Sequence, residues 1–145
     1  MNYTYKYPRP ALTVDIAVFK KTKDGNKILL IKRKSNPFMG MWALPGGFVD
    51  MDETIEVAAK RELFEETNLS NILLEQFHVF SEVDRDPRGR TVSVVFVGFL
   101  EEPKEIKAGD DAEEACWFEI INLPELAFDH LIIIRMIEEM RLNQS

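Results

Sequence analysis

Three glutamates near the middle of the chain could do chemistry together: Glu62, Glu65 and Glu66. At helical spacing of i, i+3 and i+4, all three side chains project from one face. Like charges at this spacing repel each other, and only Lys60 and Arg61 lie close enough in the sequence to compensate them. A carboxylate cluster suits a hard cation such as Mg²⁺, which binds oxygen and shares its shell with substrate phosphates. A solvated acidic helix face is the alternative, and the spacing alone leaves both open.

The segment that carries these glutamates is predicted to be a helix. Thr54 is a candidate N-cap, the helix runs to Thr67, and Asn68 follows as a residue that tolerates the left-handed conformation at a helix end. Apolar residues recur at helical spacing and predict its buried stripe: Ile55, Ala58, Ala59 and Leu63. Upstream, Pro45-Gly46-Gly47 is predicted to break regular structure and to bring bare backbone close to the start of the helix.

The rest of the chain predicts strands and one more helix. Strands are expected at 12–19, 27–33, 75–83, 91–100 and 115–120, with a short apolar segment at 41–44. A turn signal at 23–26 makes the first two strands a candidate hairpin. The second helix is expected at about 128–142, with a buried stripe of Leu131, Ile134, Ile137 and Met140. This order of elements predicts an α+β or mixed layered domain, and a length of 145 residues fits a single domain over 1–145.

The stretch from Gly47 to Leu69 resembles the signature of the Nudix hydrolase superfamily. That signature reads Gly, five residues, Glu, seven residues, Arg-Glu, apolar, any, Glu-Glu, any, Gly, apolar. The matching positions here are Gly47, Glu53, Arg61, Glu62, Leu63, Glu65, Glu66 and Leu69. The chain departs from the pattern at Asn68, which stands where the last glycine is expected, and Asn can also adopt a positive φ.

The resemblance implies a three-layer α/β/α sandwich around a mixed β-sheet. It also implies hydrolysis, dependent on Mg²⁺ or Mn²⁺, of a diphosphate that joins a nucleoside to another group. Glu62 and Glu66 would be the main metal ligands, with Glu65 beside them and the backbone carbonyl of Gly46 as a further ligand. Arg61 and Glu53 would form a supporting ion pair that orients the acids.

A diphosphate repels an anionic nucleophile, so metal ions must neutralise its charge and acidify a bound water, whose proton a nearby carboxylate can take. The superfamily does not use one fixed base. The candidates are Glu53, a glutamate of the metal face, and an acid of the segment 110–114, among which Glu114 is favoured. A solvated acidic turn is the alternative for that segment.

Features outside the signature concern the substrate. Phe38 and Trp42 flank the loop before it and could stack on a base, although Trp42 could equally belong to the core. Arg33 ends a predicted strand near the site and could touch phosphates, and a basic strand end on the surface is the alternative.

Two further segments contain candidate substrate-binding residues. Residues 84–90 include Arg85, Arg88 and Arg90, whose guanidinium groups could grip phosphate or pair within the turn. Asp129 and His130 stand at the start of the last helix, where a structural or capping histidine is the alternative.

Residues 42–49, 84–90 and 126–130 together resemble one branch of the superfamily, which contains ADP-ribose pyrophosphatases and the Nudix-like sensor domains of regulators of NAD metabolism. On this resemblance the reaction is cleavage of ADP-ribose to AMP and ribose 5-phosphate. One alternative is a pyrophosphohydrolase for nucleoside triphosphates of the 8-oxo-dGTP type. Another is a non-catalytic ADP-ribose sensor, against which the intact acids of the signature argue. A purely structural protein would have no need for three glutamates on one face.

Composition excludes several other classes. The net charge of −7 argues against non-specific binding to nucleic acid or to an anionic membrane. Cys116 is the single cysteine, and neither a signal-peptide segment nor an apolar run of the roughly 20 residues that span a bilayer is present. A cytoplasmic protein is expected. The branch resemblance suggests a homodimer, with Tyr3, Tyr5 and Tyr7 as an intersubunit arm or, alternatively, as part of a surface-packed N-terminus.

Overall fold

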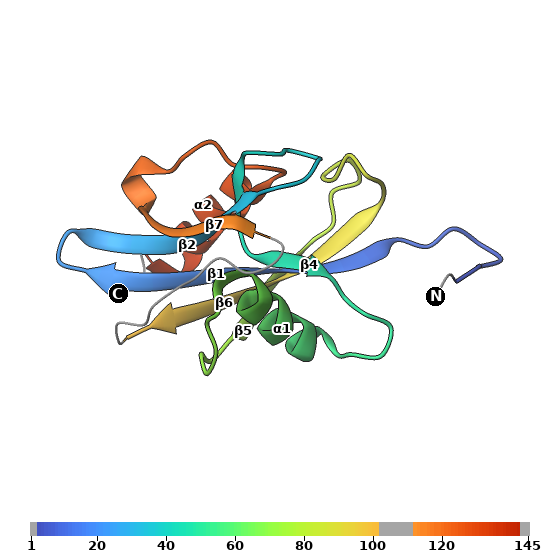
Figure 1. Cartoon of the computed structure of the whole chain (residues 1–145), viewed down its shortest axis with the longest axis horizontal. Coiled ribbons are helices and arrows are strands. Elements are labelled where there is room, and N and C mark those ends of the chain that lie inside the picture. The colour runs from blue at the N-terminus through green and yellow to red at the C-terminus, as the bar shows by residue number, and fades with distance from the viewer. Residues whose placement is uncertain (1–2, 102–111, 143–145) are drawn as a thin grey trace.

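The computed structural model describes residues 3–101 and 112–142, and Figure 1 shows the arrangement of their helices and strands. The elements are β1 (Ala11–Thr22), β2 (Gly25–Arg33), β3 (Trp42–Ala43), β4 (Gly46–Phe48), α1 (Ile55–Thr67), β5 (Glu75–Phe80), β6 (Thr91–Leu100), β7 (Ala112–Glu119), the 3₁₀-helix η1 (Ile120–Asn122), α2 (His130–Ile137) and the π-helical turn η2 (Glu138–Leu142).

Strand β1 is the centre of a mixed sheet. In the described part of the chain the strand order is β3-β2-β1-β6-β5, with β4 paired to β1 and β7 paired to β2. On one edge β1 pairs antiparallel with β4 at 13–15 and then with β2 at 19–22. On its other edge it runs parallel to β6 over its residues 11–20. Three strands therefore pair with β1, and β4 lies at its N-terminal half.

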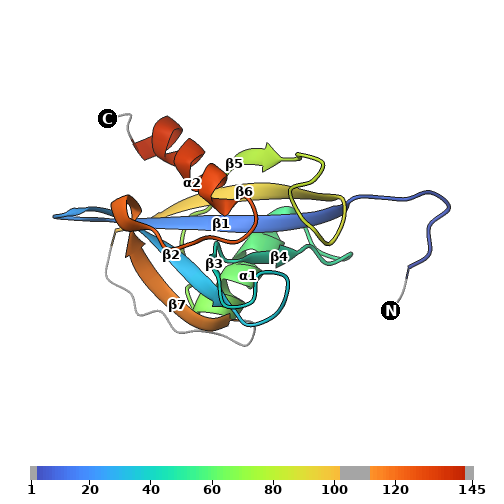
Figure 2. The same ribbon diagram turned by 90° about the horizontal axis from the view of Figure 1, so that it is seen from above.

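Helices cover the two faces of the sheet, and Figure 2 shows α1 and α2 on opposite sides of β1. Side chains alternate along a strand, so β1 serves both layers. Its residues 14, 16 and 18 pack with Ala58, Ala59 and Leu63 of α1. Its residues 17 and 19 pack with Ile133, Ile134 and Ile137 of α2. This arrangement confirms the mixed, layered fold that the sequence predicts.

Two predictions about local structure are wrong in part. Residues 45–47 do not end regular structure, because Gly46–Phe48 forms β4 on β1. The buried face of α2 contains His130, Ile133, Ile134 and Ile137, whereas Leu131 and Met140 are each 47% exposed. Ile134 and Ile137 are thus buried as predicted, and Leu131 and Met140 are not. The run 131–134 is apolar throughout, so it fits more than one helical phase. Within the described residues, no helix has the length and apolar character needed to cross a membrane.

Candidate active site

The bounds of α1 are those that the sequence predicts. Thr54 is the N-cap, and its hydroxyl accepts a hydrogen bond from the backbone N–H of Val57 at 3.2 Å. Asn68 ends the helix with a φ of 67°, in the left-handed conformation that the superfamily's glycine would adopt. The apolar stripe of the helix is turned to the sheet, and this orientation leaves Glu62 and Glu66 buried at its border with β4.

Glycines let the backbone of β4 approach these two glutamates. The Gly46 N–H donates a hydrogen bond to Oε2 of Glu66 at 2.8 Å. A Cβ at Gly47 would lie 2.5 Å from Oε1 of Glu62, closer than carbon and oxygen can approach. A Cβ at Gly46 would lie 2.2 Å from the carbonyl oxygen of Val14 on β1. The missing Cβ therefore leaves room for the Glu62 carboxylate at Gly47 and for strand β1 at Gly46.

Arg61 connects the acids of this region. Its guanidinium donates to both carboxylate oxygens of Glu53, at 2.9 Å and 2.5 Å, and to Oε1 of Glu62 at 2.9 Å. It also reaches Oε2 of Glu65 and the carbonyl of Phe48, each at 3.2 Å. One cation thus fixes three carboxylates and ties α1 to β4.

The bond from Arg61 and the backbone N–H of Asp50 lower the pKa of Glu53 to about 2. The hydrogen bond that Arg61 donates to Glu53 is also the largest cause that raises the pKa of Arg61 above its usual value. A carboxylate with so low a pKa is a weak base at neutral pH, which argues against Glu53 as the group that takes the proton of water. Its position fits the supporting ion pair with Arg61.

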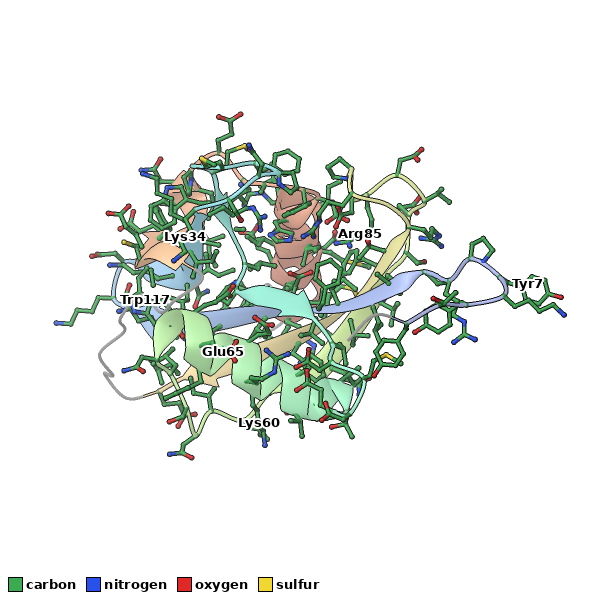
Figure 3. The ribbon with its side chains drawn as sticks, turned by 45° about the vertical axis from the view of Figure 1, so that its right-hand side comes forward. Tyr7, Lys34, Lys60, Glu65, Arg85 and Trp117 are labelled. Carbon is green, nitrogen blue, oxygen red and sulfur yellow. The ribbon has the colours of Figure 1, made fainter. Side chains whose placement is uncertain are left out.

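A pocket opens beside β4 and reaches Glu66. Its polar lining comes from β1, β2, α1, the segment before β6 and the start of α2, namely Thr13, Asp15, Arg33, Glu66, Arg85, Asp86, Arg88 and His130. Its aromatic lining is Phe48 and Phe128. Figure 3 labels Arg85 on the segment that leads into β6, and Glu65 on α1. The pocket therefore joins the carboxylate face of α1 to residues from distant parts of the chain.

Two of the pocket arginines are already neutralised. Arg85 is buried and forms a bidentate pair with Asp129, at 2.9 Å and 2.8 Å. Arg88 forms a bidentate pair with Asp86, whose pKa it lowers. Since the charge of each guanidinium is matched by a carboxylate, neither is a free cation for a phosphate.

Arg33 differs from them. Its Nε donates to the carbonyl of Pro37 at 2.7 Å, and its guanidinium lies over the ring of Phe128 at 4.9 Å. Burial and the nearby charge of Arg88 lower its pKa. In the part of the chain that the structure describes, no carboxylate lies within 4 Å of it as an ion-pair partner. Arg33 is the cation that this pocket offers to an anion.

Asp15 and His130 form the buried polar end of this pocket. Ser93 of β6 donates to Oδ2 of Asp15 at 2.5 Å. The Nδ1 of His130 accepts from the backbone N–H of Leu44 at 3.0 Å, so the proton of the neutral imidazole is on Nε2, 3.5 Å from Oδ1 of Asp15. Burial lowers the pKa of His130, which keeps the ring neutral at pH 7.

Four predicted site residues lie elsewhere. Trp42 packs edge-on against Phe118 in the core, and Phe38 packs against Phe128 behind the pocket lining. Arg90 is exposed at the start of β6, and its carbonyl accepts from Ala11. Glu114 is exposed on β7, with a carboxylate 3.8 Å from Nζ of Lys32. Of the remaining acids of that predicted segment, Asp110 and Asp111 lie outside the described residues, and the side chain of Glu113 is not described either.

The sequence analysis did not single out several residues of the pocket. Asp15 is the clearest, because an aspartate in the middle of a Val- and Ile-rich strand is costly to bury unless it has partners. That signal was present in the sequence. Phe48, Asp86 and Phe128 gave no comparable signal, and neither did Ser93, the partner of Asp15, since each has an ordinary place in a strand or turn.

The oxygen donors of this region fit a hard divalent cation by their chemistry. Glu62 and Glu66 are buried carboxylates next to the Gly46-Gly47 backbone, and Mg²⁺ binds such oxygens. Across residues 3–101 and 112–142, no group of three or more His, Cys, Asp or Glu side chains is already gathered around one point. Glu65 is turned to Arg61.

Solved structures resemble this fold closely. The NUDIX domain of Shewanella oneidensis NrtR, solved in complex with ADP ribose, matches with a TM-score of 0.88 and 32% identity, over 96% of this chain and 94% of that one. A MutT/nudix family protein from Enterococcus faecalis matches with a TM-score of 0.83 and 36% identity, over 95% of this chain and 66% of that one.

The comparison with curated relatives by sequence agrees with the comparison of structures. An ADP-ribose pyrophosphatase from Methanocaldococcus jannaschii is 52% identical over 129 residues, which are 89% of this chain and 73% of that protein. The ADPR responsive transcriptional repressor NtrR of Acinetobacter baylyi is 37% identical over 86% of this chain, which spans about half (51%) of the repressor. A family model for the NUDIX domain matches residues 10–138, and the chain therefore belongs to the Nudix family.

Proposed function

We propose that this protein is a hydrolase that cleaves ADP-ribose to AMP and ribose 5-phosphate. The observation that carries the proposal is the pocket in which Glu66, held against the backbone of Gly46, lies beside the cation of Arg33. A carboxylate face for a metal ion and a cation for a phosphate are the two requirements of diphosphate hydrolysis. The pyrophosphatase from Methanocaldococcus jannaschii and the NrtR domain solved with ADP ribose support the choice of substrate.

The proposed cofactor is Mg²⁺, with Mn²⁺ as a substitute. Glu62 and Glu66 would hold it, together with the carbonyl of Gly46 and with Glu65. When bound, the metal neutralises diphosphate charge and acidifies a water. Arg61 orients Glu62 and Glu65 through its hydrogen bonds, and Glu53 fixes Arg61 in turn. The chain thus supplies both the carboxylates and the ion pair that keeps them in place.

Arg33 is the proposed phosphate-binding residue. Its guanidinium is half-buried, lies over Phe128, and has the carbonyl of Pro37 as its hydrogen-bond acceptor. A diphosphate would supply the negative charge that the pocket lacks at this point and would raise the pKa that burial and Arg88 lower. Arg85 and Arg88 act instead through their carboxylate partners, as positioning residues for the pocket wall.

Two carboxylates are the proposed candidates for the general base, Glu114 and Glu65. Glu53 is set aside because its pKa of about 2 makes it too weak a base. The variants Glu114→Gln and Glu65→Gln separate the two candidates. Loss of the base lowers kcat at saturating metal, whereas loss of a metal ligand raises the metal concentration required for half-maximal rate.

A product-resolved assay tests the proposal. The purified protein with Mg²⁺ is given ADP-ribose, other nucleoside diphosphate sugars, dinucleotides and 8-oxo-dGTP in parallel. We expect AMP and ribose 5-phosphate from ADP-ribose with the highest kcat/KM. Preferential release of pyrophosphate from 8-oxo-dGTP would make the protein a triphosphate pyrophosphohydrolase. Tight binding of ADP-ribose without turnover would make it a sensor.

A cytoplasmic homodimer without a nucleic-acid partner completes the proposal. Tyr3, Tyr5 and Tyr7 are exposed on the segment before β1, and Figure 3 shows Tyr7 at the far end of that arm. Exposed aromatic side chains of this kind are common in protein interfaces. Light scattering of the full chain should give twice the 16.8 kDa monomer mass. A variant with serine at the three tyrosines should give the monomer mass, and a wild-type monomer would refute the dimer.

A further inference from the structure

The buried end of the pocket contains a carboxylate that the proposed hydrolysis does not use. Asp15 is 8% exposed in the centre of the sheet, on β1 opposite Gly46 of β4. Its Oδ2 accepts from the Ser93 hydroxyl and lies 3.9 Å from Nη2 of Arg85. These contacts hold one oxygen of the carboxylate. Its other oxygen, Oδ1, faces His130.

His130 presents a donor to that oxygen at a distance too long for a strong bond. The Leu44 N–H occupies Nδ1, so the proton is on Nε2, which lies 3.5 Å from Oδ1 of Asp15. A charge-assisted N–H···O⁻ bond has a length of about 2.7–2.9 Å. Both atoms belong to residues that line the pocket. A ligand atom there therefore meets an acceptor and a donor side by side.

One kind of ligand group satisfies both atoms at once. A hydroxyl donates its proton to Oδ1 of Asp15 and accepts from Nε2–H of His130. A phosphate carries a negative charge at neutral pH that the Asp15 carboxylate repels, so a neutral hydroxyl fits the pair better. Arg33 lines the same pocket and favours an anion. The pocket therefore offers two different binding groups, Arg33 for a phosphate and Asp15 for a hydroxyl.

We propose that Asp15 and His130 form a hydroxyl-binding pair that selects a sugar joined to the diphosphate, and that disfavours a further phosphate at that position. The inference rests on the proposed function, since it names what distinguishes ADP-ribose from a nucleoside triphosphate. A Cβ on Gly46 would lie 2.6 Å from Oδ1 of Asp15, so the pair borders the backbone of the metal face. The hydroxyl that it binds belongs to the sugar nearest the bond that is cleaved.

Binding of product fragments tests the pair independently of turnover. Calorimetry without metal compares ribose 5-phosphate with inorganic phosphate on the wild type and on Asp15→Asn. We expect Asp15→Asn to weaken ribose 5-phosphate by about 10- to 100-fold, which is the effect of one hydrogen bond to a charged group. Binding of inorganic phosphate should stay the same or tighten, because a negative charge has been removed. Glu56→Gln, an exposed acid bonded to Gln76, is the control and should change neither.

His130→Asn provides a second variant if Asp15→Asn does not fold. The asparagine oxygen can still accept from the Leu44 N–H, but the donor at Nε2 is lost. It should also weaken ribose 5-phosphate selectively. Equal weakening of ribose 5-phosphate and inorganic phosphate would show that Asp15 and His130 only maintain the shape of the pocket, and would overturn the proposal. Unchanged binding of ribose 5-phosphate would overturn it too. Wild-type protein that binds ribose 5-phosphate but leaves ADP-ribose intact would refute the proposed hydrolysis and leave the pair standing.

Discussion

Gly46 and Gly47 are neighbours in β4, but a change to alanine should affect different properties at the two positions. It should lower activity at Gly47 and stability at Gly46. At Gly47 an added Cβ would lie 2.5 Å, 2.6 Å and 2.8 Å from three atoms of the Glu62 carboxyl group. At Gly46 it would lie 2.2 Å from the carbonyl oxygen of Val14 and 2.6 Å from Oδ1 of Asp15. The first clash involves the end of a flexible side chain, and the second involves the backbone of the central strand.

The contact distances set the expected magnitudes. Ordinary contact begins near 3.4 Å, so the Glu62 carboxylate must move by about 1 Å in Gly47→Ala. Neither glycine has a positive φ, and the gain of about 0.4–1 kcal/mol from a stiffer unfolded chain then offsets most of the cost. A catalytic group displaced by 1 Å costs about 100-fold in rate. In Gly46→Ala the strand pair itself must separate, which should cost about 3 kcal/mol, the upper end for overpacking.

Urea unfolding and AMP release measure the two effects on each variant. Gly47→Ala should unfold with a free energy within about 1 kcal/mol of wild type while kcat/KM for ADP-ribose falls about 100-fold. Gly46→Ala should lose about 3 kcal/mol. Wild-type activity in Gly47→Ala would show that the position of Glu62 does not matter. A loss of several kcal/mol in that variant would show that the side chain cannot absorb the clash.

Three other changes test separate parts of the site. Glu66→Gln should remove most activity, because a proposed metal ligand is lost, with little change in the melting temperature. Glu53→Gln should cost about 2 kcal/mol at pH 7, because Arg61 loses a charged acceptor. Since the pKa of Glu53 is about 2 in the folded protein, against 4.5 for the free side chain, the wild type has this contribution in full above pH 4.5 and loses it as the pH falls toward 2. The free energies of unfolding of the wild type and Glu53→Gln should therefore converge at low pH. A difference that stays constant with pH would contradict the ion pair. Arg33→Ala should raise KM for ADP-ribose more than tenfold and leave the protein folded, and an unchanged KM in steady-state kinetics would exclude it as the phosphate-binding residue.

Local signals predicted α1 correctly, because they agree with one another. Thr54 caps the start, Asn68 ends it in the left-handed conformation, and the apolar spacing between them fits one helical face. The glutamate face follows from that spacing alone. In α2 the local signals disagree, since four consecutive apolar residues allow several phases, and the packing against β1 selects the face that contains Ile133 and Ile137.

The pocket could not be predicted in the same way, because its parts meet only through sheet register. Asp15 and Ser93 come together since β1 and β6 pair in parallel, and Asp129 joins them through Arg85. No local pattern specifies that register. The Gly46-Gly47 dipeptide was misread for a related reason: its small size is explained by what lies across from it on β1 and α1, which the neighbouring sequence does not reveal.

The parallel pair of β1 and β6 also sets the order in which the protein can assemble. It joins residue 11 to residue 91 and residue 20 to residue 100, so a segment of about 80 residues must close before the central strand is complete. Closing such a loop costs about 4 kcal/mol of chain entropy, calculated as (3/2)RT ln n, before any contact offsets this cost. At a synthesis rate of about 5–20 residues per second, β1 waits roughly 4–16 s on the ribosome for this partner. The β1–β2 hairpin can form during that interval, whereas the buried Asp15 cannot reach Ser93. The helix with the glutamates can form early as well, and the pocket beside it is among the last parts of the molecule to take shape.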